Sequence, residues 1–437
     1  MLSTRLNHLD ATFLNIDRRP ETWSVHIEIR VSKRISARRL TYALRAAIAR
    51  HPLARARLKY FEGTAKDYYW EFPPELDHLP LTIWEPKDEQ GVDNIRNRFV
   101  SIQVPLTLAP AFMLYLVRSD GGDYLMLNVP HALGDGLSAF RLMQSILRIY
   151  AEQPDPQADL KVLEVRDLLA LAGAKSTSQR LERTKLLLEH LAKSTTAPVR
   201  IASKGIKPTE NIEDLPGYGV HQFRLSAADS KRFMSRREKP ATVNDQLLAA
   251  MTLAIRRWND SCSTTPGRVA LMMPVNLRPQ EWWHEVFSNF SSYVSISVDA
   301  QDQTTLEATT AKVSQQTIAF KEAGAAGTLI DLLDIPKFLP AFLKGRLKEL
   351  FPLFGKNLME TTWVSNLGKL SAFPALGDAG EVTALYFTPP APMPCSVSLG
   401  IVCMGDELLM GIRWRRSQFD QAAMVEFAAL LKSVMLE

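Results

Sequence analysis

The chain has 437 residues, of which 46% are hydrophobic and 23% charged, as in a globular protein with a large core. This length allows two domains or one large two-lobed unit. The net charge of +5 is modest and the basic residues are scattered, so nucleic-acid binding is not expected. No apolar run of roughly 20 residues predicts a membrane-spanning helix and Met1 to Asp10 lacks a signal-peptide core, so we expect a cytoplasmic protein.

The three cysteines, Cys262, Cys395 and Cys403, are odd in number and have no Cys-x-x-Cys spacing. Neither a disulfide framework nor a zinc site is therefore indicated, and we expect small buried or half-buried residues. No metal and no bound cofactor is expected, because the phosphate-loop, dinucleotide-binding and zinc-protease motifs are all missing from the sequence.

Apolar periodicity predicts the first elements of the chain. Ser3 to Asp17 is interpreted as a turn with a capping Asp, and Trp23 to Val31 alternates as a half-buried strand does. Ser36 to Arg50 is a predicted helix capped by Ser36. Residues 112–118 and 124–129 are predicted to form a hairpin across Asp120-Gly121-Gly122.

The stretch from Asn128 to Ser138 places a histidine between a buried strand and an apolar helix that starts near Leu137. Gly134 and Gly136 flank Asp135 and allow backbone conformations closed to other residues, so the loop could bend sharply and hold His131 away from the helix. Three simpler interpretations stay open. Asp135 is a natural N-cap for the helix, His131 fits a core histidine bonded to a carbonyl, and Gly-Asp-Gly is a common turn.

In the second half, an amphipathic helix over 179–193 is followed by residues 194–217, which are rich in Ser, Thr, Pro and Gly and predict a crossover. A strongly apolar helix is predicted over 244–258. The buried strand 268–274 ends at Pro274-Val275-Asn276-Leu277-Arg278-Pro279. Arg278 beside prolines is a fixed guanidinium, and if it is buried it needs an anionic partner.

Residues 329–355 predict a cationic amphipathic helix, either a surface helix or an interfacial face for acyl chains or lipids. The strand 361–368 ends in Ser365-Asn366-Leu367-Gly368, where the side chains of Ser365 and Asn366 either donate to a developing oxyanion or only form a turn. A hairpin over 397–414 and a helix over 419–435 complete the chain.

The motif His-x-x-x-Asp-Gly formed by His131, Asp135 and Gly136 resembles the signature of the CoA-dependent acyltransferase superfamily. This superfamily includes chloramphenicol acetyltransferase, condensation domains of peptide synthetases, polyketide-associated acyltransferases and wax ester synthases. The segment around Arg278 and the Ser288-Asn289 loop resemble the wax-synthase branch. Two adjacent histidines are usual in that branch and in condensation domains, but here the first is Pro130. The BAHD acyltransferases form another branch of the superfamily, and the absence of their sequence Asp-Phe-Gly-Trp-Gly argues against that branch.

The resemblance implies an α/β (α+β) fold with two chloramphenicol-acetyltransferase-like lobes, each a mixed sheet flanked by helices, in a V-shaped arrangement. Residues 1–175 would form the first lobe, 176–217 a crossover and 218–437 the second lobe. The active site would lie where the lobes meet, in a channel open on both faces, and the strand over 361–368 would cross towards the other lobe. A monomer is expected.

The resemblance also implies a chemistry. His131 would be the general base that moves an acyl group from a CoA or carrier-protein thioester to an alcohol or amine acceptor, in natural-product or lipid biosynthesis. Asp135 and Arg278 would brace the loop, Gly136 would shape it, and Ser365, Asn366 and Gly134 are candidate oxyanion or substrate contacts. Because Pro130 breaks the double histidine and the sequence shows no obvious lipid anchor, a stand-alone condensation-like or natural-product acyltransferase is favoured over a storage-lipid wax synthase. Any membrane association would be peripheral. The alternative is a non-catalytic relative that binds a carrier protein or acyl ligand.

Overall fold

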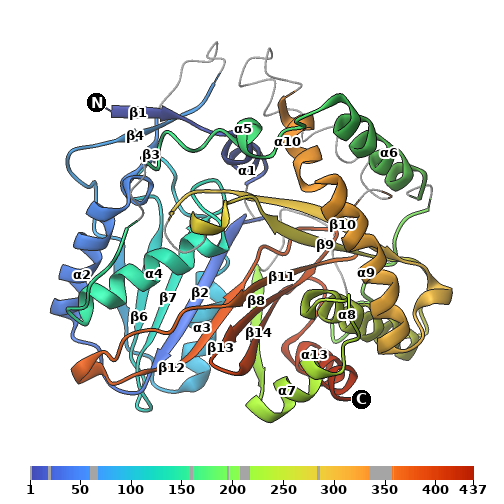
Figure 1. Cartoon of the computed structure of the whole chain (residues 1–437). Coiled ribbons are helices and arrows are strands. Elements are labelled where there is room, and N and C mark those ends of the chain that lie inside the picture. Colours follow the sequence, from blue (N-terminus) through green and yellow to red (C-terminus); the bar gives the residue numbers. More distant parts are fainter. Residues whose placement is uncertain are drawn as a thin grey trace.

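The computed structural model of the chain describes residues 2–17, 21–59, 67–157, 161–193, 196–206, 217–282, 286–334, 357 and 359–437. These residues form two lobes that lie side by side (Figure 1). Among the described residues no helix is long and apolar enough to cross a bilayer.

The first lobe is built on a mixed five-stranded sheet. Its strands follow the order β12 (Val382–Thr388), β2 (Ser24–Val31), β7 (Tyr124–Pro130), β6 (Met113–Val117) and β5 (Leu81–Trp84). The helices around it are α2 (Ala37–Arg50), α3 (Glu89–Phe99) and α4 (Gly136–Tyr150). Leu125 and Leu127 of β7 pack into the core formed with α2 and α4, whereas Tyr124 and Met126 pack with α3. The central strands are therefore apolar on both faces, because helices cover both.

The second lobe is built on a six-stranded sheet. Its strands follow the order β10 (Ser291–Val298), β9 (Val269–Asn276), β11 (Thr362–Lys369), β13 (Val397–Met404), β14 (Glu407–Arg415) and β8 (Tyr218–Leu225). The helices that pack against it are α7 (Ala227–Ser235), α8 (Val243–Ser261), α9 (Leu306–Ala323) and α13 (Gln421–Leu436). Their apolar sides form one core with the sheet, in which Leu248, Ile401 and Phe427 are buried.

Smaller elements close the top of the molecule as it is drawn in Figure 1. They are the small sheet of β1 (Leu2–Arg5), β4 (Tyr69–Phe72) and β3 (Arg57–Leu58), and the helices α1 (His8–Ile16), α5 (Leu168–Ala172), α6 (Thr177–Lys193) and α10 (Ala326–Asp334). The turn predicted over Ser3 to Asp17 is wrong, because α1 forms there. Asn7 caps α1 by accepting from the amide of Asp10, and the Asp10 carboxylate accepts from the amide of Asn7 in return.

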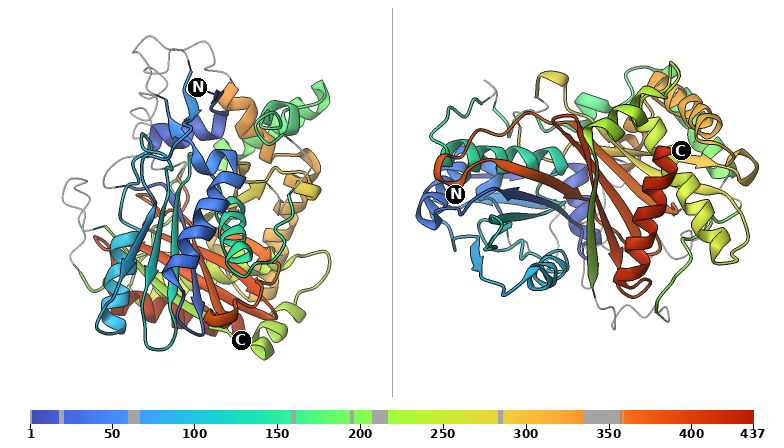
Figure 2. Two further views of the ribbon diagram at one scale, coloured as in Figure 1. Left: turned by 90° about the vertical axis from the view of Figure 1, so that its left-hand side faces the viewer. Right: turned by 90° about the horizontal axis from the view of Figure 1, so that it is seen from below.

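Strand β12 crosses from the second lobe to the first and pairs antiparallel with β2 (Figure 2). Gly400 and Gly411, paired across β13 and β14, make room for it: a Cβ would lie 2.1 Å from the Phe387 carbonyl oxygen at Gly400 and 2.7 Å at Gly411. The sequence-based division placed residues 382–388 in the second lobe, and here they belong to the first sheet. The strand predicted to cross, β11, stays in the second sheet, and the chain after it crosses.

Buried arginines lock β14 onto the first lobe. Arg413 donates hydrogen bonds to the carbonyl oxygens of Ser24 (2.9 Å) and Val100 (2.6 Å) and to the hydroxyl of Thr22 (2.8 Å). Arg415 binds the carboxylate of Glu21 at 2.7 Å. Both guanidinium groups lie over the ring of Tyr218, 4.0 Å and 4.4 Å from its centroid. The interface between the lobes is thus a network of charge-assisted hydrogen bonds.

Most other elements match their predictions. Ser36 caps α2, the apolar helix predicted over 244–258 forms as α8, and the hairpins β6–β7 and β13–β14 form as expected. Strand β2 is buried along nearly its whole length instead of half-buried, because α3 covers its second face: His26 packs on Phe99 and Glu28 accepts hydrogen bonds from Arg96. The cationic helix predicted over 329–355 lies outside the described residues except for its start in α10.

Arg413→Met is expected to lower the free energy of unfolding by about 3 kcal/mol, because it leaves buried carbonyl groups of Ser24 and Val100 without that donor. Urea denaturation followed by tryptophan fluorescence measures the change. The matched control is Arg224→Met, since Arg224 sits on the neighbouring strand in an exposed pair with Glu407 and should change stability by no more than about 0.5 kcal/mol. Equal losses in the two variants would contradict a role for Arg413 in locking the lobes.

Candidate active site

His131 lies in the short turn between β7, which ends at Pro130, and α4, which begins at Gly136. Its amide donates to the carbonyl oxygen of Trp23 at 2.7 Å, so the loop starts as a continuation of the β2–β7 pairing. Asp135 caps α4 by accepting from the amide of Ser138 at 3.0 Å, which confirms the N-cap interpretation. A buried strand and a buried helix therefore fix both ends of the histidine loop.

The two glycines of the loop are needed for space and not for unusual backbone angles. Neither Gly134 nor Gly136 has a positive φ, which corrects the expectation from sequence. A Cβ on Gly136 would lie 2.7 Å from Cδ2 of Leu367 and 3.1 Å from the ring of Phe387. The start of α4 can therefore approach the end of β11 and the crossing strand β12 only because residue 136 has no side chain.

Asp135 and Arg278 form a buried, two-armed ion pair between the lobes. Arg278 Nη1 lies 2.7 Å from Asp135 Oδ2 and Nη2 lies 2.8 Å from Oδ1, and both side chains are at most 4% exposed. The amide of Phe290 also donates to Asp135 Oδ2 at 2.8 Å. Burial raises the pKa of Asp135, but the charge and hydrogen bonds of Arg278 outweigh it and hold the pKa below its usual value. The expected ion pair is confirmed.

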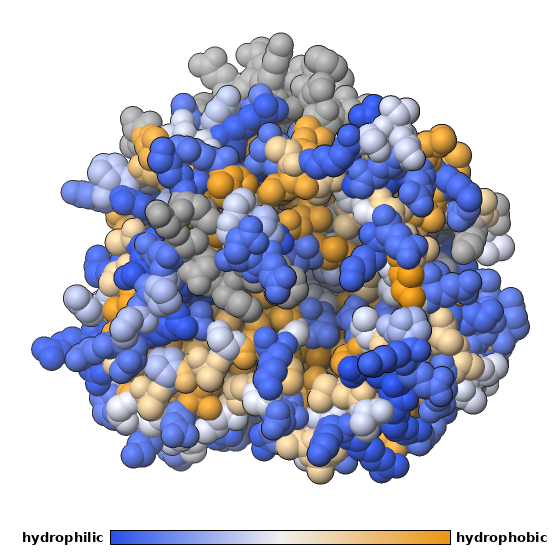
Figure 3. Space-filling view, in the orientation of Figure 1, coloured by the Kyte–Doolittle hydropathy of each residue, from blue (hydrophilic) through white to orange (hydrophobic). Residues whose placement is uncertain are grey.

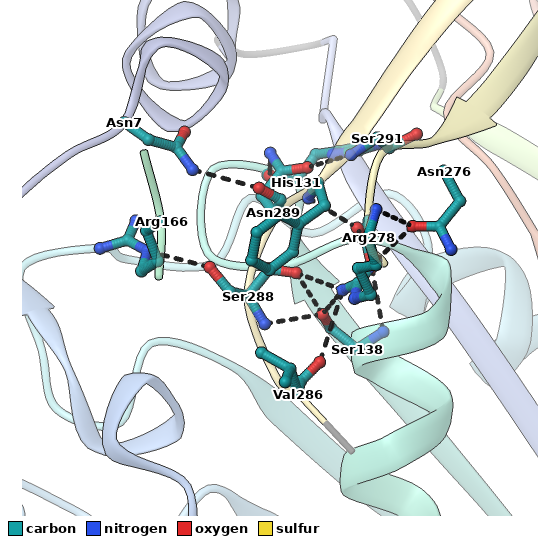
Figure 4. Close-up of polar contacts among 12 residues, drawn as sticks. Asn7, His131, Ser138, Arg166, Asn276, Arg278, Val286, Ser288, Asn289 and Ser291 are labelled. Carbon is teal, nitrogen blue, oxygen red and sulfur yellow. Dashed lines mark hydrogen bonds and ion pairs between the residues drawn. The ribbon is translucent and has the colours of Figure 1, made fainter. Parts of the chain in front are cut away.

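Arg278 also fixes the surrounding backbone, as Figure 4 shows. Its Nη2 donates to the hydroxyl of Ser138 at 2.8 Å and to the carbonyl oxygen of Ser288 at 2.5 Å. Ser138 in turn accepts from the amide of Ser288 at 2.9 Å. The oxygen Oδ1 of Asn276 accepts from Arg278 Nη1 at 3.1 Å. One guanidinium thus joins α4, the end of β9 and the segment before β10.

Asn289 holds the histidine loop directly. Its side-chain amide donates to the carbonyl oxygen of His131 at 2.9 Å, and its own carbonyl oxygen accepts from the side chain of Asn7 at 3.1 Å (Figure 4). The position of His131 therefore depends on a residue from the second lobe and, through it, on the cap of α1. The sequence placed Asn289 in a family-like loop but did not predict this contact.

A second buried ion pair supports the first. Arg166 donates to the carboxylate of Asp10 and, through Nε, to the hydroxyl of Ser288 at 2.9 Å. Trp70 Nε1 donates to the same carboxylate at 3.2 Å. Burial raises the pKa of Asp10 to about 6, although Arg166 and the hydrogen bonds from Trp70 and Asn7 lower it in part. The network from α1 to the Ser288 segment thus contains two carboxylates and two guanidinium groups.

The His131 imidazole is half-buried and stacks on the ring of Phe13 from α1, with centroids 3.9 Å apart and planes 19° apart. Burial lowers the pKa of His131 to about 4, while the Asp135 charge and the backbone carbonyl of His131 itself raise it in part. At neutral pH the ring is therefore uncharged and able to accept a proton. The sequence pattern around Phe13 does not indicate this stacking contact.

His131 lines a cavity of about 130 Å³ to which both lobes contribute. Its apolar wall consists chiefly of Phe13, Val25, Leu137, Trp363, Leu367 and Phe387. Ser291, Ser292 and Tyr293 of β10 add a polar wall. Apolar side chains also gather where the surface is hollowed near the middle of the face in Figure 3. The cavity is thus a mixed apolar and polar site at the junction of the lobes.

Of the three residues predicted to contact an oxyanion or substrate, Ser365 and Asn366 line the cavity and Gly134 does not. Asn366 Oδ1 also accepts from the amide of Gly368 at 2.8 Å, so the turn that was the alternative interpretation is present. The amide of Gly134 donates to the carbonyl oxygen of Pro130 at 3.2 Å. Gly134 is therefore not placed to donate to a bound oxyanion.

Asn276 is a cavity residue that the sequence analysis missed. Its Oδ1 is occupied by Arg278, whereas Nδ2 is buried and has no hydrogen-bond partner among the described residues. A buried donor without a partner that lines a cavity is suited to a bound acceptor atom. Its position two residues before Arg278 on the same strand end is the only signal the sequence offered.

No set of three or more His, Cys, Asp or Glu side chains in the described ranges is arranged to hold a metal ion. Cys395 is buried and Cys262 and Cys403 are partly buried, as predicted.

Comparison with known proteins agrees with this geometry. The family model of the condensation domain matches residues 12–328. Two curated relatives, uncharacterized protein Rv2305 of Mycobacterium tuberculosis strain H37Rv and uncharacterized protein MT2362 of strain CDC 1551, are each 37% identical over 438 residues, covering 99% of this chain and 99% of theirs. The chain belongs to the condensation domain family, within the CoA-dependent acyltransferase superfamily.

Solved structures share the fold. The first condensation domain of the CDA synthetase has a TM-score of 0.71 at 13% identity, covering 100% of this chain and 97% of that one. The trichothecene 15-O-acetyltransferase TRI3 of Fusarium sporotrichioides has a TM-score of 0.71 at 10% identity, covering 99% and 94%. The predicted two-lobed fold, with a mixed sheet in each lobe, is confirmed.

Arg278→Ala is expected to lower the free energy of unfolding by about 3–5 kcal/mol, because it leaves the Asp135 carboxylate buried without its counter-charge. Asp135→Ala should be destabilising for the same reason. The double variant should lose clearly less than the sum of the two single losses, since neither charge is then left unpaired. Urea denaturation of the three variants gives the coupling, and strictly additive losses would contradict the ion pair.

Proposed function

We propose that this protein transfers an acyl group from a thioester, carried by CoA or by a carrier protein, to an alcohol or amine, with His131 as the general base. The observation that supports the proposal is that the His131 imidazole lines a cavity shared by both lobes, in a loop held from the second lobe by Arg278 and Asn289. Burial also lowers the pKa of His131, which favours the uncharged form that a base requires. A cavity lined by residues of both lobes is suited to a reaction between two substrates.

The reaction needs a base and a donor to the oxyanion. His131 takes the proton from the acceptor hydroxyl or amine as its oxygen or nitrogen attacks the thioester carbonyl carbon. The carbon–sulfur bond then breaks, and the thiol leaves with the proton returned by the imidazolium. Because an ordinary thiol has a pKa near 8.5, its departure needs little assistance. No covalent intermediate on the protein is required.

Asn276, Ser365 and Asn366 are the donors that we propose for the negative charge on the carbonyl oxygen. All three line the cavity together with His131. Asn276 Nδ2 has no other partner among the described residues, so it can donate without breaking a bond. Donors that are already fixed in place stabilise a developing oxyanion better than water does, because they need no reorganisation.

The source of the acyl group is proposed from the family. Condensation domains act on substrates carried by carrier proteins, and the similar structures include an O-acetyltransferase. Pro130, in place of the first histidine of the usual pair, is buried at the end of β7, and its carbonyl oxygen accepts from the amides of Leu133 and Gly134. The substitution thus keeps the turn, and leaves His131 as the base that we propose.

His131→Ala is expected to slow thiol release from an acyl thioester by roughly 10²–10⁴-fold with an alcohol acceptor. The loss should be smaller with an amine, because a free amine needs less deprotonation before it attacks. Free thiol measured with a chromogenic disulfide reports the rate. The control His78→Ala removes an exposed imidazole and should leave the rate unchanged. Equal rates for wild type and His131→Ala would refute the enzymatic proposal in favour of a non-catalytic binding protein.

The pH dependence gives an independent test. Because the pKa of His131 is lowered to about 4, the base stays deprotonated well below the ordinary histidine pKa of about 6.5. The ratio kcat/KM should therefore stay level from about pH 8 down to about pH 5.5 and fall only as the pH approaches 4. Circular dichroism at each pH shows whether the protein is still folded. A fall in kcat/KM centred near pH 6.5 with the fold intact would contradict the lowered pKa.

A further inference from the structure

A second cavity lies in the second lobe and is lined by residues of α8, α9 and the segment 236–241 that follows α7. Figure 1 shows the positions of α7, α8 and α9. We call this cavity the α8–α9 pocket, and its volume is about 320 Å³, within the range of small-molecule sites. It shares no lining residue with the His131 cavity. The reaction proposed above gives this pocket no role.

Three buried polar side chains in the α8–α9 pocket have atoms without partners. Gln246, Thr310 and Ser314 are 2%, 6% and 4% exposed, and Gln246 Oε1, Thr310 Oγ1 and Ser314 Oγ have no hydrogen-bond partner among the described residues. Nη1 of Arg236 is likewise buried and without a partner. Buried polar atoms are nearly always hydrogen-bonded in folded proteins, so four such atoms around one cavity indicate that something else binds them.

Neighbouring polar side chains on α9 have hydrogen-bond partners. Thr309, adjacent to Thr310, is fully buried and donates to the carbonyl oxygen of Asp302 at 3.1 Å. Thr317 donates to Asp245 Oδ1 at 2.8 Å, and Gln316 Nε2 donates to the carbonyl oxygen of Ser297 at 2.8 Å. Within α8 and α9, the buried side-chain atoms without partners are those of Gln246, Thr310 and Ser314, which line the cavity.

The charges of the α8–α9 pocket favour an anion. Three cations and two carboxylates line it, which leaves one positive charge in excess, and the five residues are Arg236, Arg237, Lys239, Glu238 and Glu307. One carboxylate is already engaged, since Glu307 accepts from Arg236 Nη2 at 3.2 Å. Arg237 and Lys239 make no ion pair within the described part of the chain and are exposed at the mouth. An anionic group would therefore find its counter-charge at the entrance.

We infer that the α8–α9 pocket binds a small hydroxylated organic anion. Its phosphate or carboxylate contacts Arg236, Arg237 and Lys239, and its hydroxyl groups hydrogen-bond to Gln246, Thr310 and Ser314. The carbon skeleton packs on the apolar wall that Leu306 and Ile318 provide. A hydroxyl both donates and accepts, so it can satisfy an amide oxygen and a side-chain hydroxyl at once.

Isothermal titration of the purified full chain tests the inference with four probes: glycerol 3-phosphate, gluconate, inorganic phosphate and glycerol. At least one of the two hydroxylated anions is expected to bind at least tenfold more tightly than both phosphate and glycerol. Tighter binding of glycerol 3-phosphate would indicate a phosphorylated ligand, and tighter binding of gluconate a carboxylated one. If neither hydroxylated anion exceeds the two simple probes, the inference is wrong.

Matched variants locate the binding. Thr310→Val and Gln246→Leu should each raise the Kd at least tenfold, whereas Thr309→Val and His131→Ala should leave it unchanged. Thermal unfolding without ligand should affect these two threonine variants in the opposite way: Thr309→Val should be less stable than Thr310→Val. Thr310→Val keeps or raises the wild-type Tm because it removes an unsatisfied group, and Thr309→Val lowers the Tm because it breaks a hydrogen bond. Binding that survives Thr310→Val, or a Tm loss as large as that of Thr309→Val, would overturn the assignment.

Discussion

The ion pair between Asp135 and Arg278 is the interaction on which the site depends. The same carboxylate caps α4, accepts from the amide of Phe290 and binds a guanidinium from the other lobe. A surface pair would contribute little, but this pair is almost wholly buried, so both charges need each other. The loop that presents His131 is therefore fixed only when the two lobes are in contact.

In this arrangement Asp135 holds the loop in place, and His131 is left free for the proposed chemistry. Asp135 binds Arg278 and caps the helix, so its charge is largely compensated by the guanidinium, and the imidazole of His131 stacks against Phe13. The low pKa of His131 follows from its burial. Burial thus keeps the base uncharged at neutral pH, and the Asp135 charge raises the pKa of His131 only in part because that carboxylate is bound to Arg278. A histidine paired directly with an aspartate would be more readily protonated.

The sequence predicted the elements of the chain better than their assembly. Periodicity located α2, α8 and the hairpin β13–β14, and the motif resemblance nominated His131 and the partners Asp135 and Arg278. Position 136 needs a glycine because Leu367 and Phe387 lie against it, and only tertiary packing reveals that. Phe13 and Asn276 were missed because an aromatic stack and an unpartnered amide depend on contacts far apart in the sequence.

Because β12 comes from the C-terminal half of the chain but pairs with β2, the first lobe cannot complete its sheet without the second half. Strand β12 covers one edge of β2 in the first sheet while it lies in the groove that Gly400 and Gly411 open in the second. A first lobe produced alone would end before this strand and expose a row of unpaired amide and carbonyl groups along β2. Such an edge is a template for strand addition by other chains, so the isolated half would be prone to self-association. The two lobes are in this sense one folding unit.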